Sequence, residues 1–188
     1  TQLSPIRINE LVFNPIATGN INLSANLPAG TTSTDPIVTP VNVYDSLGTL
    51  QPMTLTWTPT ATANTWTLSI AAPNGGGTLG TIDVSFGTGG MAAGTISGFS
   101  NATGVLTGTG GGAGTPATIG FSADFGQGAQ AMTLSLGTFG AASGLTQYSG
   151  DVFQLRNLEP DGVPLGSYSS VSIRDNGDVA INYDNGQT

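Results

Sequence analysis

Carboxylates are the side chains in this sequence that could do acid–base chemistry. The 188 residues include nine Asp and two Glu, three Arg, and no Lys, His or Cys. A glycosidase needs two carboxyl groups on either side of a sugar bond, and Glu10 or Glu159 with any Asp could supply them. Several of the Asp stand in turn-like sequences, where the side chain bonds to nearby backbone: Asp45, Asp161, Asp175 and Asp184. The pattern therefore favours structural carboxylates over a catalytic pair.

The missing residue types exclude several classes of function. Without Cys or His the chain can form no zinc finger, iron–sulfur cluster or Ser–His–Asp triad. Without Lys it has no phosphate-binding Walker lysine and no Schiff base. A net charge of −8 with three cationic side chains argues against binding to nucleic acid, whose phosphates are neutralised by Lys and Arg. We therefore predict no catalytic residue, cofactor, metal site, small-molecule substrate or nucleic-acid partner.

Membrane association is also not expected. The apolar runs are far shorter than the roughly 20 residues that cross a bilayer. No charged segment followed by an apolar one opens the sequence, so we expect no cleaved signal peptide.

Three patterns resemble ligand sites but have simpler explanations. Gly108–Gly114 reads as a phosphate loop, yet a strand-like segment follows it where a helix is required, so we predict a flexible loop. Trp57 and Trp66 could stack on a sugar, but paired tryptophans more often pack in a core. A cluster at the C-terminal end has calcium-ligand residue types without the calcium-loop spacing: Asp175, Asn176, Asp178, Asp184 and Asn185. We also expect each of the three cations to pair with a carboxylate, either across strands or across a subunit contact: Arg7, Arg156 and Arg174.

Alternating side chains indicate the fold class. Ile21, Leu23, Ala25 and Leu27 fall on one face of an extended segment, with Asn and Ser on the other. Strong helix formers are scarce, while Thr, Val and Ile suit strands. Such segments recur at roughly 8–12-residue spacing, as in sandwiches and barrels. We predict an all-β fold, an antiparallel sandwich or flattened barrel with short hairpins and Gly/Thr-rich loops.

Short turns should join these strands. In Asp45–Gly48, Asp at the first position and Gly at the fourth predict a type I turn. Asn176-Gly177 predicts a two-residue type I′ hairpin in which both residues take a positive φ. Asn185-Gly186 repeats this chemistry near the end. The residues assigned a structural role in turns are Asp45, Gly48, Asn176, Gly177, Asn185 and Gly186.

Four segments resemble the bacterial flagellar hook protein family. The first two are Val41–Gly48, which reads Val-Asn-Val-Tyr-Asp-Ser-Leu-Gly, and the alternating Met53–Trp57 that follows it. Leu134–Tyr148 is similar to the region before the family's return segment. Ser169–Thr188 is similar to that return segment, with its Asn-Gly turn and its ending in Gln-Thr. These segments cover about a third of the chain, in the family's order.

The resemblance implies a structural protein that is exported unfolded by the flagellar type III apparatus. Subunits then polymerise outside the cell into the hook, the flexible universal joint between motor and filament. Its partners would be other hook subunits, the hook cap during assembly, and the hook–filament junction proteins. The family's helical terminal segments are not in this sequence. By matching, residues 16–147 form an outer β domain, and residues 1–15 with 148–188 form strands of an adjoining inward β domain.

The same sequence features are compatible with two other classes of protein. A flagellar rod or hook-associated protein shares parts of the same pattern. A secreted adhesin or fibre domain that binds glycans would also be a β-sandwich, but it should expose Trp57 or Trp66, whereas a hook subunit should bury both. In the hook reading we expect neighbouring outer domains to touch through polar loops, with Gly108–Gly114 and Thr31–Pro36 as the candidates.

Overall fold

The computed structural model describes residues 12–30, 34–73 and 77–188, and in these ranges it contains strands and no helix. The strands of the first half are β1 (Val12–Phe13), β2 (Asn20–Asn26), β3 (Ile37–Tyr44), β4 (Leu50–Pro59), β5 (Thr65–Ala71), β6 (Thr78–Phe86) and β7 (Ile96–Ser100). Those of the second half are β8 (Thr107–Gly108), β9 (Pro116–Asp124), β10 (Ala129–Thr138), β11 (Leu145–Thr146), β12 (Gln154–Pro160), β13 (Gly166–Ile173) and β14 (Val179–Tyr183).

Strands β3 to β7 form a five-stranded antiparallel sheet in chain order. Its inward positions are apolar except for Thr39 of β3, and its outward positions are mostly Thr and Ser. In β5, for example, Trp66, Leu68 and Ile70 are buried while Thr67 and Ser69 between them are partly exposed. This period of two is what a strand with one buried face requires.

A second sheet holds six strands, in the order β11-β2-β10-β9-β8 with β12 also paired to β2. It is mixed, because β2 runs parallel to β10 and β11 but antiparallel to β12. The parallel pairing is possible because the whole five-stranded sheet lies between β2 and β10 along the chain, which gives the long connection that parallel neighbours need.

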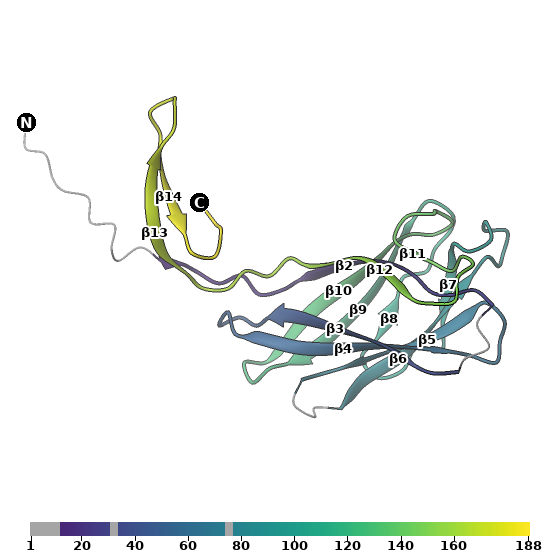
Figure 1. The fold of residues 1–188 in the computed structure, drawn as a ribbon. Helices are drawn as coiled ribbons and strands as arrows, with labels where there is room; N and C mark the ends of the chain where they lie inside the picture. Colours follow the sequence, from purple (N-terminus) through teal and green to yellow (C-terminus); the bar gives the residue numbers. More distant parts are fainter. Residues whose placement is uncertain (1–11, 31–33, 74–76) are drawn as a thin grey trace, which may run out of the picture.

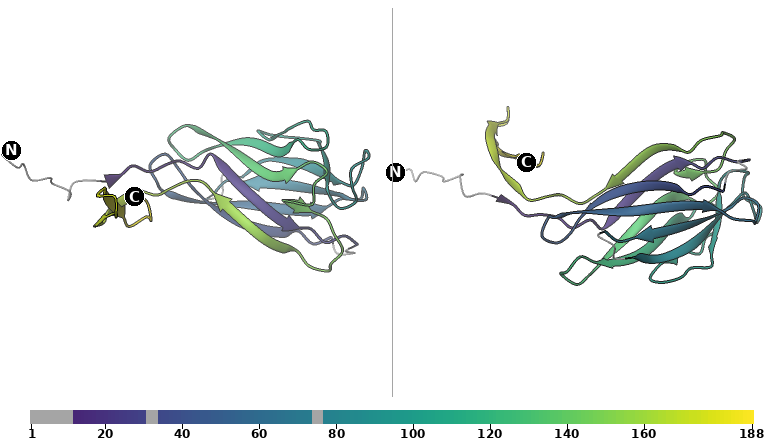
Figure 2. Two further views of the ribbon diagram at one scale, coloured as in Figure 1. Left: turned by 90° about the horizontal axis from the view of Figure 1, so that it is seen from above. Right: turned by 60° about the horizontal axis from the view of Figure 1, so that its bottom comes forward.

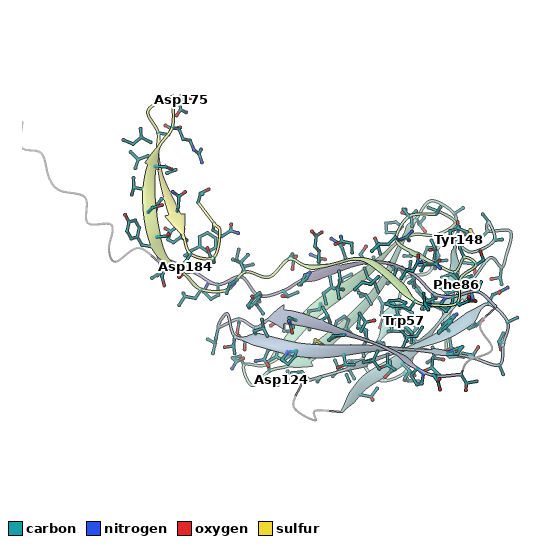
Figure 3. The ribbon with its side chains drawn as sticks, in the orientation of Figure 1. Trp57, Phe86, Asp124, Tyr148, Asp175 and Asp184 are labelled. Atoms are coloured by element: carbon teal, nitrogen blue, oxygen red, sulfur yellow. The ribbon has the colours of Figure 1, made fainter. Side chains whose placement is uncertain are left out.

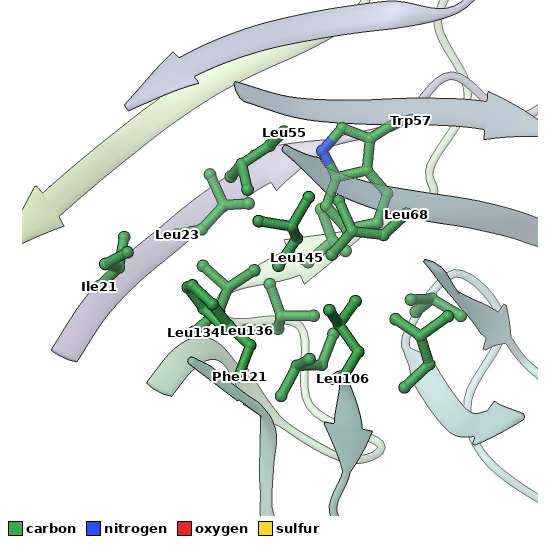
Figure 4. Close-up of a cluster of buried hydrophobic side chains, with 14 of the residues drawn as sticks. Ile21, Leu23, Leu55, Trp57, Leu68, Leu106, Phe121, Leu134, Leu136 and Leu145 are labelled. Carbon is green, nitrogen blue, oxygen red and sulfur yellow. The ribbon is translucent and has the colours of Figure 1, made fainter. Parts of the chain in front are cut away.

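The two sheets pack face to face and bury one hydrophobic core (Figure 4). Figure 4 shows side chains from both sheets in this core, among them Leu23 of β2, Leu134 of β10 and Trp57 of β4. Ile21 of β2 and Leu136 of β10 belong to the same core. These side chains are almost fully buried, and burying each Leu or Ile stabilises the fold by about 1.5–3 kcal/mol. The structure confirms the predicted all-β sandwich.

A third, three-stranded sheet stands apart from the sandwich, with the order β1-β13-β14 (Figures 1 and 2). It has no second layer in the described chain, so several of its apolar residues are exposed, among them Ile173 at 74% and Val179 at 64%. Its β13–β14 hairpin projects away from the sandwich in Figure 1.

The pairing of β12 differs from the expected division of the chain. Residues 148–188 were predicted to join an inward domain, but β12 pairs with β2 from Ile21↔Pro160 to Asn26↔Gln154. Two strands that hydrogen-bond along their length belong to one sheet, so this part of the chain lies in the sandwich. Strands β7 and β8 lie in the stretch 87–114, where Gly, Ser and Thr dominate and apolar residues do not alternate with polar ones.

The turn at Asn176-Gly177 also differs from its prediction. Among the described residues other than glycine, φ is positive at Asn64 and Asn101 alone, so Asn176 does not adopt the type I′ conformation. The loop instead has three residues, with only Gly177 at positive φ (+89°). The side chain of Asn176 explains the difference, because its Oδ1 accepts a hydrogen bond from the amide of Asp178 at 3.1 Å and so closes a local turn.

Candidate functional site: the junction between the sandwich and the three-stranded sheet

Two chain segments connect the sandwich to the three-stranded sheet, and they run side by side (Figures 1 and 2). They form an antiparallel ribbon, here defined as residues 12–26 paired with residues 154–167. Val12 and Phe13 pair with Ser167 and Gly166. Ile16 and Val163 exchange two backbone hydrogen bonds of 2.8 Å. The ladder then continues as β2 and β12. One two-stranded ribbon therefore links both parts of the molecule.

The ribbon bulges where it enters the sandwich. Between the Ile16–Val163 and Ile21–Pro160 pairs, residues 17–20 lie opposite only residues 161–162. The bulge turns Thr18 into the body, where it is fully buried. The amide of Thr18 donates to the carbonyl of Tyr44 at 2.9 Å, and the amide of Tyr44 donates to Thr18 Oγ1 at 2.9 Å. The bulge is thus fixed to the end of β3.

Gln130 of β10 joins the second sheet to the same point. Its Nε2 donates to the carbonyl oxygens of Thr18 at 2.9 Å and Tyr44 at 3.1 Å. Since β3 and β10 belong to different sheets, this one amide ties the ribbon to both layers of the sandwich. Sequence reasoning missed both Thr18 and Gln130, because their partners lie 26 to 112 residues away along the chain.

Asp161 holds the other side of the bulge. Its Oδ1 accepts the amides of Gly19 at 2.8 Å and Asn20 at 2.9 Å, and its Oδ2 accepts Asn20 Nδ2 at 2.9 Å. Desolvation alone would raise the pKa of Asp161, but the hydrogen bonds from Asn20 and Gly19 outweigh it and lower the pKa below its ordinary value of 3.8. The turn-like sequence around Asp161 predicts a cap on a local turn, whereas its partners Gly19 and Asn20 lie on the opposite strand.

The predicted turn at Asp45–Gly48 lies against this ribbon. The amides of Leu47 and Thr49 donate to Asp45 Oδ1, and Gln51 Nε2 donates to Oδ2, each at 2.9 Å. Burial raises the pKa of Asp45, but these bonds together lower it. Gly48 closes the turn with φ of +78°, and a Cβ there would lie 2.7 Å from Pro15 Cβ.

The predicted turn at Asn185-Gly186 reaches the junction from the three-stranded sheet. Asn185 Nδ2 donates to the carbonyl of Pro164 at 2.9 Å. The neighbouring Asp184 accepts the amide of Ser167 at 2.7 Å through Oδ1. Phe13 packs edge-on against Tyr183, with ring centroids 5.6 Å apart. The structure therefore brings two of the three predicted turns to the ribbon, while Asn176-Gly177 lies at the far tip of the β13–β14 hairpin.

The other candidate sites do not assemble. Figure 3 shows Asp175 and Asp184 at opposite ends of the β13–β14 hairpin, so the five residues with calcium-ligand types are not gathered at one point. In the described ranges, no three Asp, Glu, His or Cys side chains come together as a metal site requires. Glu159 lies on β12 and accepts Asn157 Nδ2, and Glu10 lies outside the described residues.

Both tryptophans are buried, Trp57 fully and Trp66 at 3% exposure. They lie on neighbouring strands with their side chains in the core, which is the arrangement expected of a hook subunit and not of a glycan-binding groove. Part of Thr31–Pro36 lies outside the described residues.

Within the described part of the chain, Arg156 binds backbone carbonyls and a hydroxyl, and not the carboxylate expected across strands. Its Nη2 donates to the carbonyl oxygens of Gly144 at 2.7 Å and Ala25 at 3.3 Å, and to Thr146 Oγ1 at 3.3 Å. The guanidinium therefore satisfies backbone carbonyls where β2 and β11 meet. Arg7 lies outside the described residues.

The Gly-rich loop is packed more closely than its composition predicts. A Cβ at Gly111 would lie 2.2 Å from the ring of Phe139, which is buried, and a Cβ at Gly108 would lie 2.7 Å from Phe99. The amide of Gly114 donates to the carbonyl of Phe139 at 2.9 Å. Part of this loop thus covers the core instead of standing free.

The geometry of the junction suits a mechanical role more than a chemical one. Its polar groups are hydrogen-bonded to one another, and they fix the ribbon to the sandwich on one side and to the three-stranded sheet on the other.

Across residues 12–30, 34–73 and 77–188, the structure has no helix with the length and hydropathy needed to cross a membrane.

Comparison with known proteins gives one family. Residues 17–163 match the model of the flagellar basal body protein FlaE D2 domain. A similar solved structure is the flagellar hook protein FlgE2 of Helicobacter pylori, with 17% sequence identity and a TM-score of 0.47 over 80% of this chain. The match spans 30% of the length of that hook protein. No curated protein matches the chain in sequence. Because the family match covers well over half of the residues, the chain belongs to the flagellar basal body protein FlaE D2 domain family.

Proposed function

We propose that this chain is part of a structural subunit of the flagellar hook, the flexible joint between motor and filament. The observation that carries the proposal is the family match over residues 17–163. The resemblance of Val41–Gly48 and Ser169–Thr188 to hook proteins supports the hook over other flagellar parts. In this role the chain catalyses nothing, and its partners are other copies of the hook subunit, the hook cap and the hook–filament junction proteins.

The proposed location is outside the cell, after unfolded export without a cleaved signal peptide. Absence of Cys is compatible with this route, because no disulfide has to form before or after passage. We further propose that the sandwich, residues 16–163, is the outer domain of the subunit. Residues 1–15 and 164–188 then belong to the adjoining inward domain, with the ribbon as the connection.

Glycan binding by an adhesin has no support from the tryptophans. A sugar-stacking platform needs an exposed aromatic face, and both indole rings lie in the sandwich core (Figure 3 labels Trp57).

Removal of the sandwich from the complete protein tests the proposal. Ile16 and Val163 form a hydrogen-bonded antiparallel pair, so a two-residue Asn-Gly turn can join them after deletion of residues 17–162. The hooks of such cells, seen by electron microscopy, should be thinner and differ in curvature from those of the parent. A control protein keeps the sandwich and carries an inserted Asn-Gly in the open turn at Gly126–Gly128. Hooks of unchanged diameter and curvature in the deletion strain would contradict the proposal.

A further inference from the structure

The Asp45–Gly48 turn meets the ribbon in a contact that leaves no room for a side chain. A Cβ on Gly48 would lie 2.7 Å from Pro15 Cβ and 3.0 Å from the backbone nitrogen of Leu165, one residue on each strand of the ribbon. Real Cβ atoms do not approach other atoms so closely, so the turn touches both strands at the point where they leave the sandwich.

Both partners in this contact are stiff. The turn is braced internally by the three hydrogen bonds to Asp45, which is only 2% exposed. On the ribbon, Pro15 has a φ fixed by its ring. The adjacent Thr18–Tyr44 hydrogen bonds prevent the turn from sliding along the ribbon.

The same turn occurs at the hairpin tip without any such contact. Gly48 donates its amide to the carbonyl of Asp45, and Gly177 donates its amide to the carbonyl of Arg174. The φ values are +78° and +89°. A Cβ at Gly177 would meet nothing within 4 Å. The two glycines therefore have the same backbone requirement, and only Gly48 has the contact.

We propose that the Asp45–Gly48 turn is a steric stop that sets the angle between the sandwich and the three-stranded sheet. We expect the ribbon alone to bend toward the β3–β4 turn between its Phe13–Gly166 and Ile16–Val163 pairs, because Pro15 has no amide hydrogen to donate to the ladder there. The turn blocks that motion by resting on Pro15 and Leu165. The inference concerns the chain itself and does not depend on its place in the hook.

Distance measurements between two spin labels test the stop. The chain has no Cys, so Val38→Cys on β3 and Ser169→Cys on β13 give two unique attachment points, one in each part. Both residues are exposed. Pulsed electron paramagnetic resonance then reports the distribution of distances between the labels. Gly48→Ala should shift or broaden this distribution, whereas Gly177→Ala should leave it as in the parent.

Equal distributions for the parent and Gly48→Ala would overturn the proposal, as would an equal shift in Gly177→Ala. A second pair of variants tests the contact from the ribbon side if Gly48→Ala does not fold. The register of the ribbon places Pro15 opposite Pro164. Pro15→Gly should broaden the distribution more than Pro164→Gly does, because Pro15 is the proline that contacts Gly48. Equal broadening in these two variants would also overturn the proposal.

Discussion

Thr18 and Tyr44 exchange two hydrogen bonds across 26 residues of sequence, one through the backbone carbonyl of Tyr44 and one through the hydroxyl of Thr18. This pair is the point where the ribbon is fixed to the sandwich. Because Thr18 is fully buried, its replacement by Val keeps the shape but leaves the amide of Tyr44 without an acceptor. We expect Thr18→Val to lower the free energy of unfolding by about 1–3 kcal/mol, measured by denaturant titration. Thr18→Ser keeps the hydroxyl and should recover most of the loss, and a Val variant as stable as the parent would show that the bond is unimportant.

Asp161 should make stability depend on pH in the acid range. Its pKa is lower in the folded chain than the ordinary 3.8, so its contribution is complete above that value and is lost as the pH falls toward the folded pKa. Asp161→Asn places an amide group where Asn20 Nδ2 needs an acceptor, so the variant should be less stable at pH 7. Its stability should also fall less steeply below about pH 4, near the ordinary carboxyl pKa.

Asn20→Ala provides the comparison for Asp161. Asn20→Ala removes the side-chain donor but keeps the two backbone amide hydrogen bonds to Asp161. Its free energy of unfolding, and the pH dependence of that free energy, should lie between those of the parent and Asp161→Asn. Unfolding free energies measured from pH 6 to pH 2 give all three curves. Parallel curves for the parent and Asp161→Asn would show that Asp161 does not contribute to the pH dependence of stability.

Gly111 should tolerate substitution less well than its neighbours. A Cβ there would lie 2.2 Å from the Phe139 ring, while Gly110 and Gly112 have open space. Gly111→Ala forces the loop or the ring to move, which costs about 1–3 kcal/mol in a packed core. Gly110→Ala and Gly112→Ala are the matched controls and should melt as the parent does. Equal melting temperatures for all three variants would mean that the loop is not packed on Phe139.

Substitution of Gly177 should be destabilising because of its backbone conformation, and not because a side chain would clash with a neighbour. Its φ of +89° is the left-handed region and no atom lies within 4 Å of a Cβ there. Gly177→Val should therefore destabilise the β13–β14 hairpin by roughly 1–2 kcal/mol, the cost of that conformation for an L-residue. Hydrogen exchange of the Arg174 amide, which donates to Asp178 at 2.9 Å, would report the change locally. Unchanged protection of this amide would count against the turn.

Alternation made the sandwich strands predictable. Ile21, Leu23 and Ala25 face the core as their spacing indicates, because a period of two has one physical meaning in a strand with one buried face. Strand β12 could not be predicted in this way, because its residues are mostly exposed and show no alternation of buried and exposed positions. Strand β7 is only five residues long and includes Gly98, so its local signal is weak.

The junction could not be predicted because it depends on contacts between distant segments. Asp161 and Gly19 are 142 residues apart, and nothing near Asp161 in the sequence distinguishes it from a turn residue. The closeness of Gly48 to Pro15 and of Gly111 to Phe139 depends on how elements pack, whereas composition shows only that glycine is allowed. Turn chemistry did locate Gly48 and Asn185, but not the ribbon against which they lie.

We propose that this chain forms part of the flagellar hook, with its sandwich joined through the ribbon to the three-stranded sheet. Electron cryo-microscopy of hooks isolated from the bacterium that makes the protein tests this most directly. The account predicts that each subunit contains a two-sheet sandwich with density for the buried Trp57 and Phe139 side chains, and a two-stranded ribbon leading from it to a three-stranded sheet. A hook whose subunits contain no such sandwich, or whose side-chain density fits a different sequence, would contradict it.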